Sequence, residues 1–372
     1  MSADDGRWRE VRAEFPVLER CAYLNTGTYG PLPRRAIAAQ SAQFELELTE
    51  GRAGSAYDAK IFAERDGLRA ELAEVIGAQS DDICLTRATT EGINIVLGGL
   101  GLGPGDQVVT SDLEHRTLMT ALEASGAQLR IAKLADAPYA EIVQRVADQV
   151  GPRTKLIALS HVDWAAGRVL PIPAISRLEP PLLVDGAQSV GAIPLDVGAL
   201  GCDFLVFPGQ KWLVGPDSSG ALYVKADRQN LLATTMASNY GHQVMADGTI
   251  APFPGAARLQ PGPLAIPSVV ALRASLSLAR ELGFARFERA RGLTEQFAEA
   301  LGARYKVIPC TERATLIAVV PPIEAARAAV QLSEQAVLVR TIPDEGWLRV
   351  SVGYWNDEND LERLLAGLEK LS

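Results

Sequence analysis

Short apolar runs alternate with segments of helical spacing along most of the chain. The runs predicted to form strands are 83–86, 107–110, 129–132, 156–160, 182–185 and 203–207. The helices predicted before and between them are 59–76, 91–97, 117–124 and 139–149. Strands joined by helices run parallel and are buried on both faces. The pattern therefore predicts an α/β fold with a mostly parallel sheet, whose ligands bind beyond the carboxyl ends of the strands.

A stretch rich in proline and glycine, residues 252–263, interrupts this alternation. The elements predicted beyond it are helices at 267–282 and 284–301 and short strands at 316–320 and 348–352. With 372 residues, the chain is long enough for one large and one smaller domain. The domains expected are a large one of residues 20–255 and a smaller α+β one of residues 1–19 and 256–372.

Composition excludes several classes of protein. A hydrophobic content of 48% with 22% charged residues is ordinary for a globular enzyme, and a net charge of −9 argues against nucleic-acid binding. No apolar run is long enough to span a membrane, and the acidic N-terminus is unlike a signal peptide. The four cysteines form no CxxC pair, so we expect no metal site and no disulfide framework. The reducing cytoplasm is the expected compartment.

Two ionisable residues follow neighbouring apolar runs at the predicted strand ends. Asp185 ends one run, and Lys211 follows the next run on a turn that contains glycine. A lysine in that place can form a Schiff base with pyridoxal phosphate, and a carboxylate can keep the pyridine nitrogen of that cofactor protonated. The pair therefore predicts a pyridoxal phosphate enzyme.

Three further segments carry candidate residues, each with a structural alternative. Residues 87–94, with Thr89 and Thr90, join a strand end to a helix start, which suits a phosphate group or a simple helix cap. His115 follows another strand end, where its side chain could stack on a flat ring, act in proton transfer or simply pack against its neighbours. We interpret His161 as a structural residue. Arg349, within a strand of the small domain, is either a solvated charge or a bidentate clamp for a carboxylate.

With these motifs in this order, the chain resembles the class V aminotransferase family, which includes cysteine desulfurases, C–S lyases and isopenicillin-N-epimerase-like proteins. The resemblance runs from residues 23–25 to residues 349–353. It implies a pyridoxal phosphate enzyme of fold type I that forms a homodimer with active sites at the interface, and an amino acid as substrate. The residues that it assigns to the cofactor are Lys211 and Asp185 as catalytic groups, His115 as the stacking and third catalytic residue, Thr89, Thr90 and Gln210 for the phosphate, and Gln188 and Trp164 near the ring hydroxyl. The residues that it assigns to the substrate are Arg349 for the α-carboxylate, and Asn25, Thr28 and Tyr29 for the pocket.

Departures from the family pattern narrow the reaction. Cysteine desulfurases carry a nucleophilic cysteine shortly before the carboxylate-binding arginine, but residues 339–348 contain none, and Cys310 lies too early, in a stretch that suits a strand. Gln210 stands where many relatives have a histidine, and Pro208 and Pro263 replace residues that donate to the phosphate. Trp164 and residues 26–30 are similar to the epimerase-like and C–S lyase branch. We therefore expect the reaction to be β-elimination from an amino acid, the candidate substrates including a cysteine S-conjugate. The alternative reactions are transamination, epimerisation and decarboxylating deamination. A cysteine desulfurase or a non-catalytic protein is less favoured.

Overall fold

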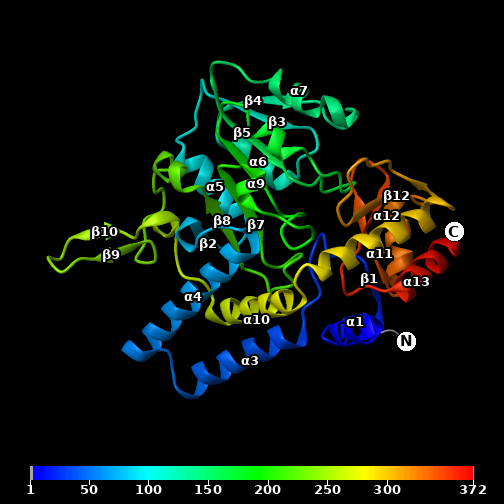
Figure 1. Cartoon of the computed structure of the whole chain (residues 1–372), viewed down its shortest axis with the longest axis horizontal. Helices are drawn as coiled ribbons and strands as arrows, with labels where there is room; N and C mark the ends of the chain where they lie inside the picture. Colours follow the sequence, from blue (N-terminus) through cyan, green and yellow to red (C-terminus); the bar gives the residue numbers. More distant parts are fainter. Residues whose placement is uncertain (1–2, 372) are drawn as a thin grey trace.

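A seven-stranded sheet forms the centre of the large domain (Figure 1). The computed structural model describes residues 3–371, so residues 1, 2 and 372 of the expected small domain lie outside it. In spatial order the strands are β2 (Ile83–Thr86), β8 (Gly220–Val224), β7 (Phe204–Pro208), β6 (Leu182–Asp185), β5 (Thr154–Ser160), β3 (Gln107–Ser111) and β4 (Gln128–Ala132).

The sheet is mostly parallel, as the alternation predicts. β8 alone among these strands is antiparallel to its neighbours, β2 and β7. The pairs from β7 to β4 are all parallel, so the carboxyl ends of β3, β5, β6 and β7 meet at one edge. The α/β fold class is confirmed, and this edge is where the predicted strand-end residues come together.

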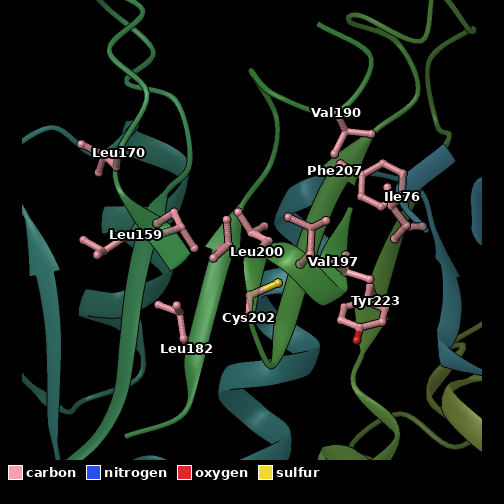
Figure 2. Packing of buried hydrophobic residues seen from close by; sticks show 14 of the residues in the cluster. Ile76, Leu159, Leu170, Leu182, Val190, Val197, Leu200, Cys202, Phe207 and Tyr223 are labelled. Atoms are coloured by element: carbon pink, nitrogen blue, oxygen red, sulfur yellow. The ribbon is translucent and has the colours of Figure 1, made fainter. Parts of the chain in front are cut away.

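Both faces of the central strands are buried, which explains why β6, β7 and β8 are mostly apolar. Along β8, Ala221 and Tyr223 contribute to one core, whereas Leu222 and Val224 contribute to the other. The helices of the first core, part of which Figure 2 shows, are α4 (Ser55–Ile76), α7 (Ile142–Ala147), α8 (Ile172–Ile175), α9 (Val197–Leu200) and α10 (Ile266–Leu282). The elements of the second are α5 (Thr89–Gly99), α6 (Arg116–Ala124) and the 3₁₀ helix η4 (Gly255–Leu259). Side chains that alternate between two cores fix the register of every strand.

The C-terminal part of the chain folds around a smaller antiparallel sheet. The strands in order are β11 (Lys306–Val307), β12 (Leu316–Val320), β15 (Trp347–Ser351) and β14 (Arg340–Ile342). The helices around them are α11 (Ala285–Gly302), α12 (Ala325–Glu334) and α13 (Glu358–Glu369). The remaining elements are α1 (Ala3–Ala13), α2 (Val17–Arg20), α3 (Arg34–Thr49), β1 (Ala22–Tyr23), β13 (Val337–Leu338), the hairpin of β9 (His242–Val244) and β10 (Ile250–Pro252), and the 3₁₀ helices η1 (Ser80–Asp82), η2 (Tyr139–Glu141) and η3 (Ala226–Leu231).

Contacts of two elements bear on where the domains divide. Helix α10 packs against α3 and α4, and its Val269 and Leu272 belong to the core of the large sheet. Strand β1 pairs in parallel with β13 of the smaller domain. We therefore propose that the large domain extends through α10, beyond the expected limit at residue 255, and that β1 belongs with the smaller domain.

Two local expectations differ from the structure. The helix expected at 139–149 begins with the 3₁₀ turn η2 and ends at Ala147. Cys310, expected in a strand, lies in irregular chain after β11, where its thiol contacts the carbonyl of Glu312. In the part of the chain that the structure describes, no helix combines the length and apolarity needed to cross a bilayer.

Helix α1 is fastened to the C-terminal domain, beside which it lies in Figure 1. Arg12 donates from both terminal nitrogens to the carboxylate of Asp360, at 2.8 and 3.0 Å, and Asp360 is completely buried. Trp8, Val11 and Phe15 of this segment join a hydrophobic cluster with Trp355. The N-terminal segment is thus held by the ion pairs of Arg12 with Asp357 and with the buried Asp360, and by an apolar contact surface.

Replacement of Arg12 should therefore destabilise the protein strongly. Arg12→Met leaves the buried carboxylate of Asp360 without its cation, and the loss of one partner of a buried pair costs about 3–5 kcal/mol. Urea unfolding followed by tryptophan fluorescence measures this loss. Arg291→Met is the control, because Arg291 is exposed in its contact with Glu295 and should change the stability by less than about 1 kcal/mol. Equal effects of the two substitutions would contradict the role of the buried pair.

Candidate active site

A cavity of about 250 Å³ lies at the carboxyl edge of the large sheet and reaches Arg340 and Arg349 of the small domain. Of the twelve site residues predicted from the sequence, the eleven that line it are Thr28, Tyr29, Thr89, Thr90, His115, Trp164, Asp185, Gln188, Gln210, Lys211 and Arg349. Asn25 is not in the lining; its side-chain oxygen accepts a hydrogen bond from the hydroxyl of Thr28 at 2.7 Å. The fold therefore brings eleven of the twelve candidate residues into the lining of one cavity.

Asp185 and Lys211 face this cavity from the ends of β6 and β7. The backbone N–H of Ala187 donates to the Asp185 carboxylate at 2.9 Å. Burial raises the pKa of Asp185, and the nearby Lys211 opposes that rise. Burial lowers the pKa of Lys211 to about 8, although Asp185 favours the charged amine. A lysine with this pKa can exchange a proton close to neutral pH.

A glycine in the N-terminal segment allows that segment to pack against the lysine loop. The N–H of Gly30 donates to the carbonyl of Gln210 at 2.7 Å. A Cβ atom at Gly30 would lie 2.1 Å from the carbonyl oxygen of Lys211, so no larger residue fits without a backbone shift. The close approach places Thr28 and Tyr29 in the cavity wall.

His115 is held as a neutral ring at the start of α6. Its Nδ1 accepts a hydrogen bond from the N–H of Thr117 at 3.2 Å, which places the ring proton on Nε2. Burial, followed by the charges of Lys211 and Arg349, lowers the pKa of His115 to about 4. The ring of Trp164 meets it edge to face, with 5.0 Å between the centroids. The arrangement suits a flat packing surface better than a proton carrier.

The N-terminus of α5 presents polar groups to the cavity. Its cap is Ala88, which has no side-chain donor or acceptor, so the side-chain helix cap that was the alternative for residues 87–94 is not formed. Asn94 instead donates to the carbonyl of Thr90. Thr89, Thr90 and Gln210 line the cavity here, and Oε1 of Gln210 has no partner in the protein. Free N–H groups at a helix start favour an anion.

Arg349 reaches the cavity from β15 and is 2% exposed. It donates to the carbonyl of Trp164 at 2.8 Å and to the hydroxyl of Thr28 at 3.0 Å, whereas its Nε has no partner. Burial, together with the charge of Arg340, lowers its pKa to about 9. Gln188 is fixed in a similar way, because it donates to the carbonyl of Gly27 and accepts from the indole of Trp212.

Sequence reasoning assigned no role to Glu114, which lies behind the cavity wall. Its carboxylate accepts hydrogen bonds from the hydroxyl of Ser111 at 2.5 Å and from the hydroxyl and N–H of Ser160 at 2.6 and 2.8 Å. Ser160 lines the cavity and is paired in register with Asp185. Burial raises the pKa of Glu114 to about 7. The only sequence signal was its place next to His115 at a strand end.

Arg340 and Thr117 also line the cavity and were not among the predicted site residues. His161 is buried outside the lining, and its N–H donates to the carbonyl of Asp185. The lining contains Lys211, Arg340 and Arg349 against the single acid Asp185. This excess of positive charge favours a ligand that carries anionic groups.

Comparisons with known proteins identify the family. The family model for aminotransferase class V matches residues 22–364. A protein named probable cysteine desulfurase from Methanothermobacter thermautotrophicus is 32% identical over 293 residues, which cover 76% of this chain and 72% of the relative. The chain belongs to the class V aminotransferase family. Class V aminotransferases use pyridoxal phosphate, which is therefore the cofactor of this enzyme.

Solved structures of one class V enzyme superpose on nearly the whole chain. A lysine-to-alanine mutant of C-DES, with glycine covalently linked to its pyridoxal phosphate, is 29% identical, with a TM-score of 0.92 over 97% of this chain and 99% of that one. The cystine C–S lyase C-DES in complex with its product cysteine persulfide is also 29% identical, with a TM-score of 0.90 over 96% of this chain and all of that one. These likenesses confirm the fold type I architecture.

The residues of the cavity fit pyridoxal phosphate. An amine and a carboxylate stand at neighbouring strand ends, a neutral imidazole lies in the wall, and a helix N-terminus offers donors to a phosphate. Oε1 of Gln210 and Nε of Arg349 are buried without a partner in the protein. Buried polar atoms are rarely left unpaired, so this acceptor and this donor suit a polar ligand.

Glu114 should make the stability of the protein depend on pH. Its pKa in the folded protein is about 7 against an ordinary value of 4.5, so the folded state holds a proton that the unfolded chain has released. The contribution is fully present below pH 4.5 and is lost as the pH rises through 7, which amounts to about 3 kcal/mol. Glu114→Gln should remove this part of the pH dependence. Denaturant unfolding at intervals from pH 4.5 to 8 measures it, and parallel curves for the two proteins would contradict the assignment.

Proposed function

We propose that the protein is a pyridoxal phosphate-dependent C–S lyase, which carries out β-elimination on a cysteine-derived amino acid such as cystine or another cysteine S-conjugate. The observation that carries the proposal is a cavity whose lining fits pyridoxal phosphate and contains no cysteine. The resemblance to C-DES, a cystine C–S lyase, supports the same reaction. Because a relative is named probable cysteine desulfurase, the alternative that experiment must exclude is persulfide formation on a cysteine of the enzyme.

The four thiols are poorly placed for persulfide chemistry. Cys84 and Cys202 are buried in the cores of the large domain, and burial raises the pKa of each to about 12. Burial also raises the pKa of Cys21 and of Cys310. The thiolate is the nucleophilic form, so a raised pKa lowers reactivity. The segment before Arg349, where cysteine desulfurases carry their nucleophilic cysteine, is here the β14–β15 hairpin, in which Ile342 pairs with Trp347. This hairpin contains no cysteine.

The roles of the chain's residues follow from their positions. Bound pyridoxal phosphate supplies an electron sink when the α-proton of the substrate leaves. Lys211 holds the cofactor and then takes the α-proton on its Nζ, for which a pKa of about 8 is suitable. Asp185 would hold a proton at the pyridine nitrogen of the cofactor, and the neutral His115 would provide a flat surface for its ring. Arg349 binds the substrate carboxylate, whose charge complements a buried guanidinium.

Thr89, Thr90 and Gln210 bind the phosphate in this proposal, through side chains and through the free N–H groups at the start of α5. Gln188 and Trp164 would hold the ring of the cofactor, and Thr28 and Tyr29 would contact the substrate. Asn25 acts through Thr28, since the hydrogen bond between them orients the hydroxyl that Arg349 contacts. Elimination from cystine consumes one water and yields pyruvate, ammonia and cysteine persulfide, so no thiol of the enzyme is needed.

The products and the cysteine variants test this reaction. With cystine, the wild type should release pyruvate and ammonia in equal amounts, and serine variants of Cys21, Cys84, Cys202 and Cys310 should keep most of this turnover wherever they fold. Lys211→Ala, the matched negative control, should lose at least about two orders of magnitude, since it removes the base. Formation of alanine, with loss of activity in one cysteine variant, would refute the lyase assignment and favour a desulfurase.

We also propose a homodimer with its active sites near the interface. Helix α3 exposes Ile37, Phe44 and Leu48 to 42%, 56% and 79%, and their spacing of seven and four residues places them on one face. A contiguous exposed apolar face is typical of a contact between proteins. Sedimentation velocity should show a dimer for the wild type and a monomer for the double variant Phe44→Asp/Leu48→Asp. A monomeric wild type at micromolar concentration would contradict the proposal.

A further inference from the structure

A second cavity, away from the cofactor residues, contains a buried arginine without a partner. The cavity has a volume of about 220 Å³ and lies between α4 and the segment that precedes α10. Arg65 of α4 is 4% exposed, and its Nε and Nη1 have no hydrogen-bond partner in the protein. A buried guanidinium is stable only when its N–H groups are satisfied, so the geometry requires an acceptor that the described chain does not supply.

The surroundings hold Arg65 in place without neutralising it. Its guanidinium carbon lies 4.4 Å from the ring centroid of Tyr240 and 5.7 Å from that of Phe62. These rings attract a cation through their faces, but they leave the N–H groups at its edge free to donate. Phe253 also lines the cavity, so a ligand would meet one charged group within a largely aromatic wall.

The other charged groups of this cavity are already engaged or exposed. Arg69 forms an ion pair with Asp66 at 2.5 Å and donates to the carbonyl of Ile83 and to Oε1 of Gln260. The carboxylate of Asp66 is therefore compensated by Arg69. Asp81 is exposed at the rim, where water screens its charge. Arg65 is thus left as the uncompensated charge of the buried part.

We propose that this cavity is a binding site for a small oxyanion, phosphate or carboxylate, which Arg65 recognises. The anion accepts hydrogen bonds from the free N–H groups of Arg65, and Tyr240 and Phe62 keep the guanidinium in position. A carboxylate on a flat apolar body uses the aromatic wall as well, whereas inorganic phosphate uses the charge alone. The site is independent of the reaction assigned to Lys211, because none of its lining residues belongs to the cofactor cavity.

Thermal unfolding of the holoenzyme tests the proposal with two probes, inorganic phosphate and benzoate, each against sodium chloride of equal ionic strength. A ligand that binds only the folded protein raises the midpoint with the logarithm of its concentration once the dissociation constant is exceeded. The wild type and Arg177→Met, whose arginine is exposed and remote, should show this rise. Arg65→Met should show a clearly smaller rise, the remainder being due to anions at Arg349 and Arg340 of the active site. Its midpoint without anion should equal or exceed that of the wild type, because an unpaired buried cation has been removed.

Saturation-transfer NMR with benzoate gives a second measurement that does not depend on the stability of the variant. Transfer to the wild type that is clearly reduced in Arg65→Met, but not in Arg177→Met, supports the site. An equal response of the wild type and Arg65→Met in both experiments would overturn the proposal. A weaker dimer in Arg65→Met, with no effect of either anion on the wild type, would also overturn it and would assign Arg65 to the contact between two copies of the chain.

Discussion

The apposition of Asp185 and Lys211 is the interaction on which the rest of the active site depends. Burial opposes the charge of each group, as the raised pKa of the acid and the lowered pKa of the amine indicate. The charged form of each is nevertheless stabilised by the other, so removal of one would leave the other as a buried charge without compensation. The parallel pairing of β6 with β7 fixes this arrangement in the backbone, and Gly30 allows the N-terminal segment to close over it.

Much of the fold could be predicted, because strands buried on both faces are distinctive in a sequence. Residues 182–184 and 204–207 are apolar at every position, and this continuity marks a parallel sheet covered by helices. The direction of β8 was not predicted, nor was the place of β2 beside it. The place of β2 depends on its pairing with β8, which lies more than a hundred residues further along the chain, and local periodicity does not encode such a pairing. The direction of β8 depends on the turn that joins it to β7, which apolar runs alone do not show. The same holds for α10, whose amphipathic face suits either domain until its neighbours α3 and α4 are known.

The features of the active site likewise divide into those that the sequence predicts and those that depend on packing. Residues that act from a strand end, such as Lys211 and Asp185, were found because parallel topology alone brings strand ends together. The bonds of Glu114 to Ser111 and Ser160 could not be found, since they depend on how two side chains turn within the ends of β3 and β5. Asn25 belongs to the right segment, but its side chain is spent on Thr28. Whether a polar residue faces a cavity or supports a neighbour is decided by packing, which the sequence pattern does not show.

Arg349 connects substrate recognition to the arrangement of the whole chain. It belongs to the small domain, but its hydrogen bonds go to Trp164 of the large domain and to Thr28 of the N-terminal segment. Its guanidinium is therefore oriented before a substrate arrives, which lowers the entropy lost on binding. With Arg340 adding to its unfavourable burial, the positive charge is poorly compensated within the protein. A carboxylate that enters the cavity supplies the missing charge, and in doing so it strengthens a junction of three segments. The same contact that selects an amino acid thus also favours the arrangement in which Lys211 and Asp185 face it.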